Sequence, residues 1–216
     1  MNWIHKITML DGSITPGIWS TSPSDQEHFM FPESFDGKSV LDVGTLDGYW
    51  AVEAKKRGAS DVMAIDVYDL PREEAKLACS SFGVKYKSSW DIFNFEHPRL
   101  EYLSTYDYVL CFGVVYHTLN PIAVLENCKK VCVDGGYVLV ESAVCQGKAS
   151  NLDESIPAIW VVDERYEQPG TEDLSNRMIP NVSGLIQMCK YAGLEIIKHK
   201  LHPSGKRCGI ICANLK

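Results

Sequence analysis

Residues 39–48 read SVLDVGTLDG, and this stretch decides the fold. An apolar run that breaks at a glycine-containing turn and continues into a helical pattern is typical of a β-strand followed by an α-helix. Gly44 and Gly48 would let the backbone of the turn approach a ligand closely, and the following helix N-terminus would offer free N–H groups to it. The stretch therefore predicts a ligand-binding turn, with a tightly packed turn that binds no ligand as the alternative.

The pattern repeats on both sides of this stretch, because apolar runs of strand-like composition alternate with stretches of helical period. We expect strands over 39–43, 61–66, 84–88, 106–112 and 137–142, and helices over 48–57, 71–83, 121–131 and 184–191. This order predicts an α/β fold with a doubly wound, mostly parallel sheet. Residues 194–201 and 209–213, joined by a short turn at Ser204-Gly205, predict a C-terminal antiparallel hairpin.

The length of 216 residues suits a single core that buries about 70% of the unfolded surface. We expect residues 1–36, which are rich in aromatic side chains, to form an N-terminal arm or lid, and residues 37–216 to form the main domain. Residues 143–180 have no clear period and predict an insertion or lid on the substrate side. Two interpretations of the arm remain open: it closes over the site, or it packs on the sheet.

The net charge of −7 makes the average surface repel phosphate backbones, which disfavours an unaided nucleic-acid binder. Four basic residues near the C-terminus, Lys198, Lys200, Lys206 and Arg207, are interpreted as solvated charges at strand ends. A local basic patch is the alternative.

The eight cysteines form no C-x-x-C pair and no Cys/His cluster at zinc-ligand spacing, so we expect no metal site. Most lie in apolar runs, as small core residues do. We find no N-terminal apolar segment of the secretory type and no apolar run near 20 residues, so we expect neither secretion nor a membrane span. These features favour a cytoplasmic protein.

Acidic residues follow the second and third expected strands. Asp66 ends its strand 18 positions after Gly48, where doubly wound nucleotide binders place a carboxylate on the ribose hydroxyls. Asp91 could accept a hydrogen bond from an adenine amino group while Ile92 or Trp90 covers a ring face. A helix cap is the alternative role for Asp91.

The fourth strand ends in CFGVVYHTLNP, residues 111–121. The order of such a sheet reverses beside its first strand, and ligands bind outside the carboxyl ends at that point. Gly113, Tyr116 and His117 are therefore expected near the ligand. A structural role is the alternative for a lone histidine.

Over about residues 37–215 these motifs resemble the class I S-adenosylmethionine (SAM) dependent methyltransferases. More narrowly, GVVYHTLNP at 113–121 and NRMIPNVSGLIQMCKYAGLEII at 176–197 are similar to the group of tRNA wobble-uridine carboxymethyltransferases and their relatives. The resemblance implies a Rossmann-like methyltransferase fold with a seven-stranded sheet and SAM as the cofactor.

The resemblance also implies a cofactor-binding set around the glycine turn and the ends of the next three strands. These residues are Asp42, Gly44, Thr45, Leu46, Asp47, Gly48, Asp66, Val67, Trp90, Asp91, Ile92, Phe112 and Gly113. Two positions depart from the pattern: Leu46 stands where the family usually has a glycine, and Thr118 stands where the wobble-uridine enzymes have an arginine. Because that arginine is the natural partner for the extra carboxylate of carboxy-SAM, plain SAM is expected here.

Methyl transfer from a sulfonium needs alignment and, for some acceptors, removal of a proton. His117 is the candidate base, because an imidazole titrates near working pH. Tyr116 is the candidate residue that orients the cofactor or the acceptor. Six further residues are candidates for the acceptor pocket: Trp3, His5, Trp19, Glu141, Trp160 and Arg177.

The wobble-uridine enzymes also have an N-terminal portion that this sequence lacks, which together with the acidic charge favours a small-molecule acceptor over tRNA. The alternatives are a tRNA-modifying methyltransferase or carboxymethyltransferase, a nicotinamide-dependent oxidoreductase and a non-catalytic SAM-fold binding subunit. The methylated atom and the oligomeric state remain open.

Overall fold

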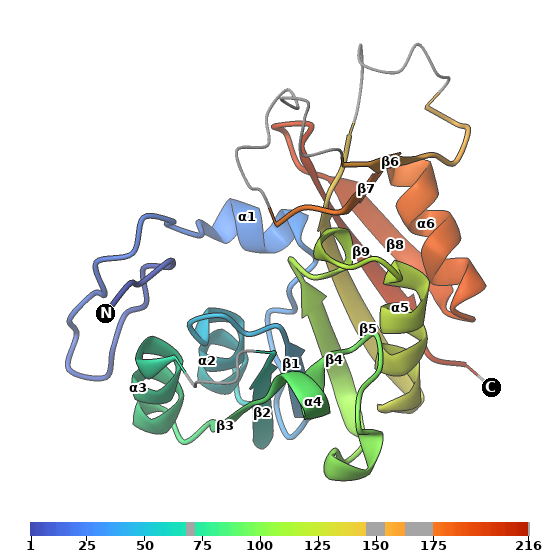
Figure 1. The fold of residues 1–216 in the computed structure, drawn as a ribbon. Helices are drawn as coiled ribbons and strands as arrows, with labels where there is room; N and C mark the ends of the chain where they lie inside the picture. Colours follow the sequence, from blue (N-terminus) through green and yellow to red (C-terminus); the bar gives the residue numbers. More distant parts are fainter. Residues whose placement is uncertain (68–71, 146–153, 163–174, 216) are drawn as a thin grey trace.

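The computed structural model describes residues 1–67, 72–145, 154–162 and 175–215. A seven-stranded sheet of order β3-β2-β1-β4-β5-β9-β8 lies between helices on both faces (Figure 1). Its strands are β1 Ser39–Val43, β2 Asp61–Asp66, β3 Lys85–Ser88, β4 Tyr106–Phe112, β5 Cys132–Ala143, β8 Glu195–Leu201 and β9 Arg207–Ala213. The prediction of a doubly wound, mostly parallel sheet with an antiparallel C-terminal hairpin is confirmed.

Strands β1 to β5 are parallel, and β9 runs antiparallel to both β5 and β8. The strand order reverses at β1, where Val43 pairs with Ile65 of β2 on one side and with Cys111 of β4 on the other. The carboxyl ends of these three central strands therefore meet at one edge of the sheet, which is where a ligand site is expected in this architecture. We call it the ligand edge.

Helices connect the strands, and several begin at side-chain caps. They are α1 Pro23–His28, α2 Tyr49–Lys56, α3 Glu73–Ser81, α4 Trp90–Phe93, α5 Pro121–Lys130 and α6 Val182–Tyr191, with 3-10 turns η1 Leu100–Tyr102 and η2 Val115–His117. The Asn120 and Asn181 side chains accept hydrogen bonds from Ala123 N and Gly184 N at the starts of α5 and α6. These caps satisfy N–H groups that have no partner within the helix. Within the described ranges, no helix is both long and apolar enough to cross a bilayer.

The N-terminal arm contributes to the core on the α2 face of the sheet. Phe35 is fully buried and Phe31 is nearly so, and their rings lie 5.0 Å from those of Tyr108 and Trp50, respectively. Burying a phenylalanine side chain contributes about 1.5–3 kcal/mol to stability. This part of the arm therefore packs on the sheet, while the domain boundary near residue 36 stays a prediction.

The α1 helix lies against the C-terminal hairpin (Figure 1). His202 Nε2 is 3.0 Å from Asp25 Oδ1, and Lys200 pairs with Glu27. A Cβ on Gly209 of β9 would stand 2.5 Å from the backbone oxygen at the end of α1, so only glycine lets the two backbones approach this closely.

Two regions differ from the sequence prediction. Strand β5 begins at Cys132 rather than near residue 137, because Asp134-Gly135-Gly136 lies inside the strand, where the pairing with β4 shifts register. Within the stretch predicted to be irregular, β6 Ile159–Val161 pairs antiparallel with β7 Met178–Pro180. Much of the predicted insertion, residues 146–153 and 163–174, lies outside the described residues.

Candidate active site

The turn after β1 contains three residues in the left-handed region. Gly44, Leu46 and Gly48 have φ values of +72°, +57° and +87°, so Leu46 adopts a conformation that favours glycine. A Cβ on Gly44 would lie 2.7 Å from Val114 Cγ2, and one on Gly48 would lie 3.0 Å from Cys79 Sγ of α3. Packing against protein atoms therefore accounts for both glycines, and their contact with a ligand stays a prediction.

Two buried carboxylates lie at the ligand edge. Asp66, 4% exposed, accepts hydrogen bonds of 2.7 Å from Leu46 N and from Val67 N, and burial raises its pKa. Asp42, 1% exposed, accepts a 2.6 Å hydrogen bond from the Thr45 hydroxyl. Burial, with a smaller effect of the Asp66 charge, raises the pKa of Asp42 to about 7. Such a pair favours a ligand that brings hydroxyl groups and positive charge.

A third buried acid, Asp47 in the turn after β1, holds the N-terminal arm. Its carboxylate is fully buried and accepts from Ile4 N at 2.9 Å and from His5 N at 2.7 Å, while His5 Nδ1 lies 2.7 Å from the other oxygen. The His5 ring stacks on Tyr49 at 4.8 Å and meets the edge of Trp19 at 5.6 Å. Contacts with the arm thus account for the burial of Asp47 and His5, and the cofactor and acceptor contacts expected of them stay predictions.

Replacing Asp47 by alanine should release the arm, because Ile4 and His5 lose their common acceptor. We expect the free energy of unfolding in urea to fall by about 2–4 kcal/mol, and trypsin to cut faster at Lys6. Burial opposes the charged form of Asp47, but its bonds to His5 and Ile4 outweigh this and lower its pKa. A depressed carboxyl pKa stabilises the fold above the unfolded-state pKa, so the difference between parent and variant should shrink below about pH 4.

The control for this experiment is Asp11→Ala, which removes an exposed acid of the same arm and should change stability by less than about 0.5 kcal/mol. Equal unfolding curves for the parent and Asp47→Ala near neutral pH would contradict the assignment.

Tyr116 and His117 lie together on η2 at the end of β4. Their ring centroids are 4.0 Å apart, Tyr116 is 7% exposed, and His117 Nδ1 is 3.0 Å from the Ser175 hydroxyl. Arg177 N donates a 2.8 Å hydrogen bond to the backbone oxygen of Tyr116, which ties the start of β7 to this turn. The structure thus brings the two predicted catalytic residues to the ligand edge, with Arg177 beside them.

Glu141 of β5 joins this cluster through Arg207 of β9. Glu141 is 2% exposed, and its two oxygens accept from Arg207 Nε at 2.5 Å and from Nη2 at 2.6 Å. Arg207 Nη1 donates a 3.1 Å hydrogen bond to the Tyr116 hydroxyl. Burial disfavours the charged form of Arg207, but Glu141 and Tyr116 outweigh it and keep the guanidinium pKa above its usual value.

The interpretation of Arg207 as a solvated charge is therefore wrong. Glu141, expected to line the acceptor pocket, has both oxygens on Arg207, and its contact with an acceptor stays a prediction. The available signal was an arginine at the start of an apolar hairpin strand, together with a glutamate near the end of the neighbouring strand.

Phe112 contributes its side chain to the core rather than to the ligand edge. Its ring lies 4.9 Å from Trp50 and 6.3 Å from Phe31 on the α2 face of the sheet. Gly113 N donates a 3.1 Å hydrogen bond to the Glu141 backbone oxygen, which extends the pairing of β4 with β5. Any cofactor contact at this position would therefore involve the backbone, and it stays a prediction.

The tryptophans predicted for the acceptor pocket have different environments. Trp3 is buried in the core on the α2 face, whereas Trp19 is 56% exposed. Trp160 of β6 is 41% exposed and pairs with Ile179 of β7, whose strand contacts η2. Of the three, Trp160 lies on the strand that pairs with β7, the strand in contact with the Tyr116–His117 turn.

The expected adenine side begins next to Asp66, because Ser89 N, just before α4, donates a 3.1 Å hydrogen bond to the Asp66 backbone oxygen. Trp90 follows on α4 and is 54% exposed. The side chains of Asp91 and Ile92 lie outside the described residues, so their predicted roles stay predictions.

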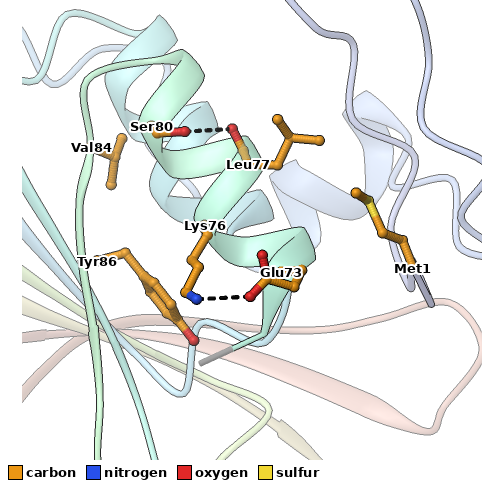
Figure 2. Close-up of a pocket in the computed structure, with 7 residues that line it drawn as sticks. All are labelled: Met1, Glu73, Lys76, Leu77, Ser80, Val84 and Tyr86. Atoms are coloured by element: carbon orange, nitrogen blue, oxygen red, sulfur yellow. Dashed lines mark hydrogen bonds and ion pairs between the residues drawn. The ribbon is translucent and has the colours of Figure 1, made fainter. Parts of the chain in front are cut away.

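One surface pocket, of about 460 Å³, lies elsewhere, against α3 and the edge strand β3 (Figure 2). It is lined by Met1, Glu73, Lys76, Leu77, Ser80, Val84 and Tyr86. None of the predicted site residues lines it. A 2.7 Å ion pair between Lys76 and Glu73 lies along it.

A protein-family model described as a methyltransferase domain matches residues 21–199. The chain belongs to the methyltransferase-domain family. The matched range includes every predicted site residue except Trp3, His5 and Trp19.

The methyltransferase domain is similar to the ubiquinone biosynthesis O-methyltransferase of Neisseria meningitidis serogroup A, with 30% identity over 169 residues. This match covers 76% of the chain and 66% of the relative. It is also similar to the tRNA U34 carboxymethyltransferase of Idiomarina loihiensis, with 26% identity over 136 residues that cover 63% of the chain and 40% of the relative. The chain thus spans slightly less than two thirds of the first relative and a smaller part of the second.

Among solved structures, the N-terminal domain of EvdMO1, crystallised in the presence of SAH and D-fucose, superposes with a TM-score of 0.64. The superposition covers 98% of this chain and 90% of that chain at 19% sequence identity. At this identity the likeness establishes the fold of the methyltransferase domain, and the family inferred from its motifs is confirmed by the sequence match.

Proposed function

We propose that the chain is a SAM-dependent methyltransferase that methylates a small-molecule acceptor. The observation that carries this proposal is the grouping, at the point where the sheet order reverses, of two buried carboxylates with the Tyr116–His117 pair. Asp66 would hold the ribose and Asp42 would face the positively charged methionine portion. Both acids are buried, and burial raises the pKa of each, so a ligand with hydroxyl groups and a positive charge suits them.

Bound SAM supplies an electrophilic methyl group on a sulfonium. The residues of the chain then have two tasks, which are to align the acceptor with that methyl group and to take up a proton where the acceptor loses one. His117 takes the proton, and the Ser175 hydroxyl at 3.0 Å from Nδ1 orients its ring. Tyr116, beside it, orients the acceptor.

A hydroxyl-bearing small molecule is the acceptor class that the relatives favour, since one of them is named as an O-methyltransferase of ubiquinone biosynthesis. A tRNA acceptor is the second candidate because another relative is named as a tRNA U34 carboxymethyltransferase. The net charge of −7 and Thr118 in place of arginine favour the small molecule and plain SAM. A cytoplasmic location is also proposed, supported by eight free cysteines, of which seven are buried.

Calorimetry with SAM, S-adenosylhomocysteine and NADH tests the cofactor. We expect the first two to bind and NADH to give no heat of binding; the opposite result would support an oxidoreductase and overturn the proposal. Tritiated methyl transfer is then measured onto 3,4-dihydroxybenzoate, caffeate, a small-molecule cell extract and total tRNA. Label in the small-molecule fractions supports the proposal, and label in tRNA alone replaces it with the second candidate. Tight SAM binding without transfer to any fraction would indicate a non-catalytic subunit.

A further inference from the structure

A polar cluster of Glu141, Arg207 and Tyr116 includes one member of the predicted catalytic pair and joins β5, β9 and η2. Glu141 of β5 pairs in register with Gly209 of β9, and Arg207 pairs with Ala143. Glu141 and Arg207 are thus diagonal neighbours on the same face of an antiparallel pair, a separation that long side chains can bridge. Their partner Tyr116 reaches the cluster from η2, so side chains from two other elements, β5 and η2, meet the guanidinium of β9.

The orientation of the guanidinium is fixed by Glu141. Nε and Nη2 of Arg207 donate to the two carboxylate oxygens at 2.5 and 2.6 Å, a bidentate contact that sets the plane of the group. The third donor, Nη1, is thereby directed at the Tyr116 oxygen at 3.1 Å, and Cζ lies 5.1 Å from the centre of the Tyr116 ring. Tyr116 is held both at its hydroxyl and at its ring face.

This arrangement excludes one direction in which the Tyr116 hydroxyl could donate. A guanidinium has donors only, so the phenolic oxygen accepts in this bond and its own proton points away from Arg207. The oxygen lies 3.7 Å from the position that a Cβ on Gly113 would take, and Gly113 directly follows β4 at the ligand edge. The positive charge of Arg207 also polarises the O–H group, which makes Tyr116 a stronger donor.

Stability alone is a weak reason for such a cluster, since a buried ion pair often contributes little net free energy compared with apolar residues of the same size. Glu141 is nearly inaccessible to solvent and Arg207 is partly buried, and Arg207 uses a further donor, Nη1, to bind the Tyr116 hydroxyl. A directional role explains the arginine, because lysine would present a single point charge and not a planar fork.

We propose that Arg207 is the positioning residue of Tyr116: held by Glu141, it directs the Tyr116 hydroxyl to donate a hydrogen bond to the acceptor. The proposal rests on the proposed function, because it assigns the orienting task of that site to a pair of residues from β5 and β9. Arg207 acts through Tyr116 and needs no contact with the cofactor.

The first test measures the environment of Tyr116 without any activity. The protein is labelled with tyrosine carrying ¹³C at Cζ, and the Tyr116 resonance is assigned by its loss in Tyr116→Phe. We expect this resonance to move in Arg207→Lys and in the double variant Glu141→Gln/Arg207→Gln, which leaves no unpaired buried charge. It should stay in place in the control Lys200→Gln, which removes a cation from the neighbouring strand β8. A Tyr116 resonance that stays unchanged in both Arg207 variants would overturn the proposal.

The second test is a double-mutant cycle on methyl transfer to the small-molecule fraction. We expect Arg207→Lys to lower kcat by about tenfold or more with KM for SAM within about threefold, and to cost less than about twofold in the Tyr116→Phe background. An equal cost in both backgrounds would show that Arg207 acts independently of Tyr116 and would reject the proposal. If SAM fails to bind or to turn over, the proposed function fails, and the NMR measurement still decides the role of Arg207.

Discussion

Replacing Asp66 with alanine is expected to weaken SAM binding by about 100-fold, as measured by calorimetry, because two hydrogen bonds between ribose hydroxyls and a carboxylate are worth about 3 kcal/mol together. The carboxylate is almost inaccessible to solvent, so no water compensates readily for its loss. It also fixes the turn by accepting from Leu46 N. Loss of the ribose contact and loosening of the turn should both weaken the binding of SAM.

Two further variants separate these effects. Asp66→Asn keeps an oxygen that can accept from Leu46 N while removing the charge, and it should bind SAM with intermediate affinity. Asp61→Ala, at the other end of β2, removes a half-buried acid that pairs with Lys85 and should leave the affinity for SAM unchanged. Equal SAM affinity for the parent and Asp66→Ala would refute the ribose assignment.

His117→Ala is expected to lower kcat by about 10²–10⁴-fold, the usual contribution of a general base, while the dissociation constant of SAM changes by less than about threefold. The reason is geometric: His117 lies at the end of β4 with Tyr116, whereas the acids assigned to SAM lie at the ends of β1 and β2. Single-turnover methyl transfer at saturating SAM measures the chemical step directly.

The control is His199→Ala, an exposed histidine of β8 that should leave both quantities unchanged. Ser175→Ala should lower kcat by less than His117→Ala does, because it loosens the imidazole without removing it. Unchanged kcat in His117→Ala would exclude this residue as the base and leave alignment alone to account for the rate.

The central strands could be predicted from the sequence, while contacts across strands could not. β1, β2 and β4 have the predicted bounds, because a strand buried on both faces appears as a continuous apolar run between polar or glycine boundaries. The start of β5 was misplaced because Asp134-Gly135-Gly136 has the composition of a turn but lies within the strand.

In the site too, residues that directly follow a strand could be predicted from the sequence, whereas contacts between distant segments could not. The Tyr116–His117 pair and Asp66 could be located because each directly follows a recognisable strand. The Glu141–Arg207 contact depends on the register of β5 against β9, and the Asp47–His5 contact joins segments that are 42 residues apart. Pairings of this kind depend on tertiary structure, which no local periodicity encodes.

The position of α1 has a consequence for how the chain is made. His202 and Lys200 contact Asp25 and Glu27 across sequence separations of 177 and 173 residues, and α1 packs on Gly209 of β9. Contacts of such high sequence separation form late, since a long loop must close first. During synthesis on the ribosome, α1 must wait for β8 and β9 to emerge before it can dock on them, and until then its contact surface stays exposed to misassembly.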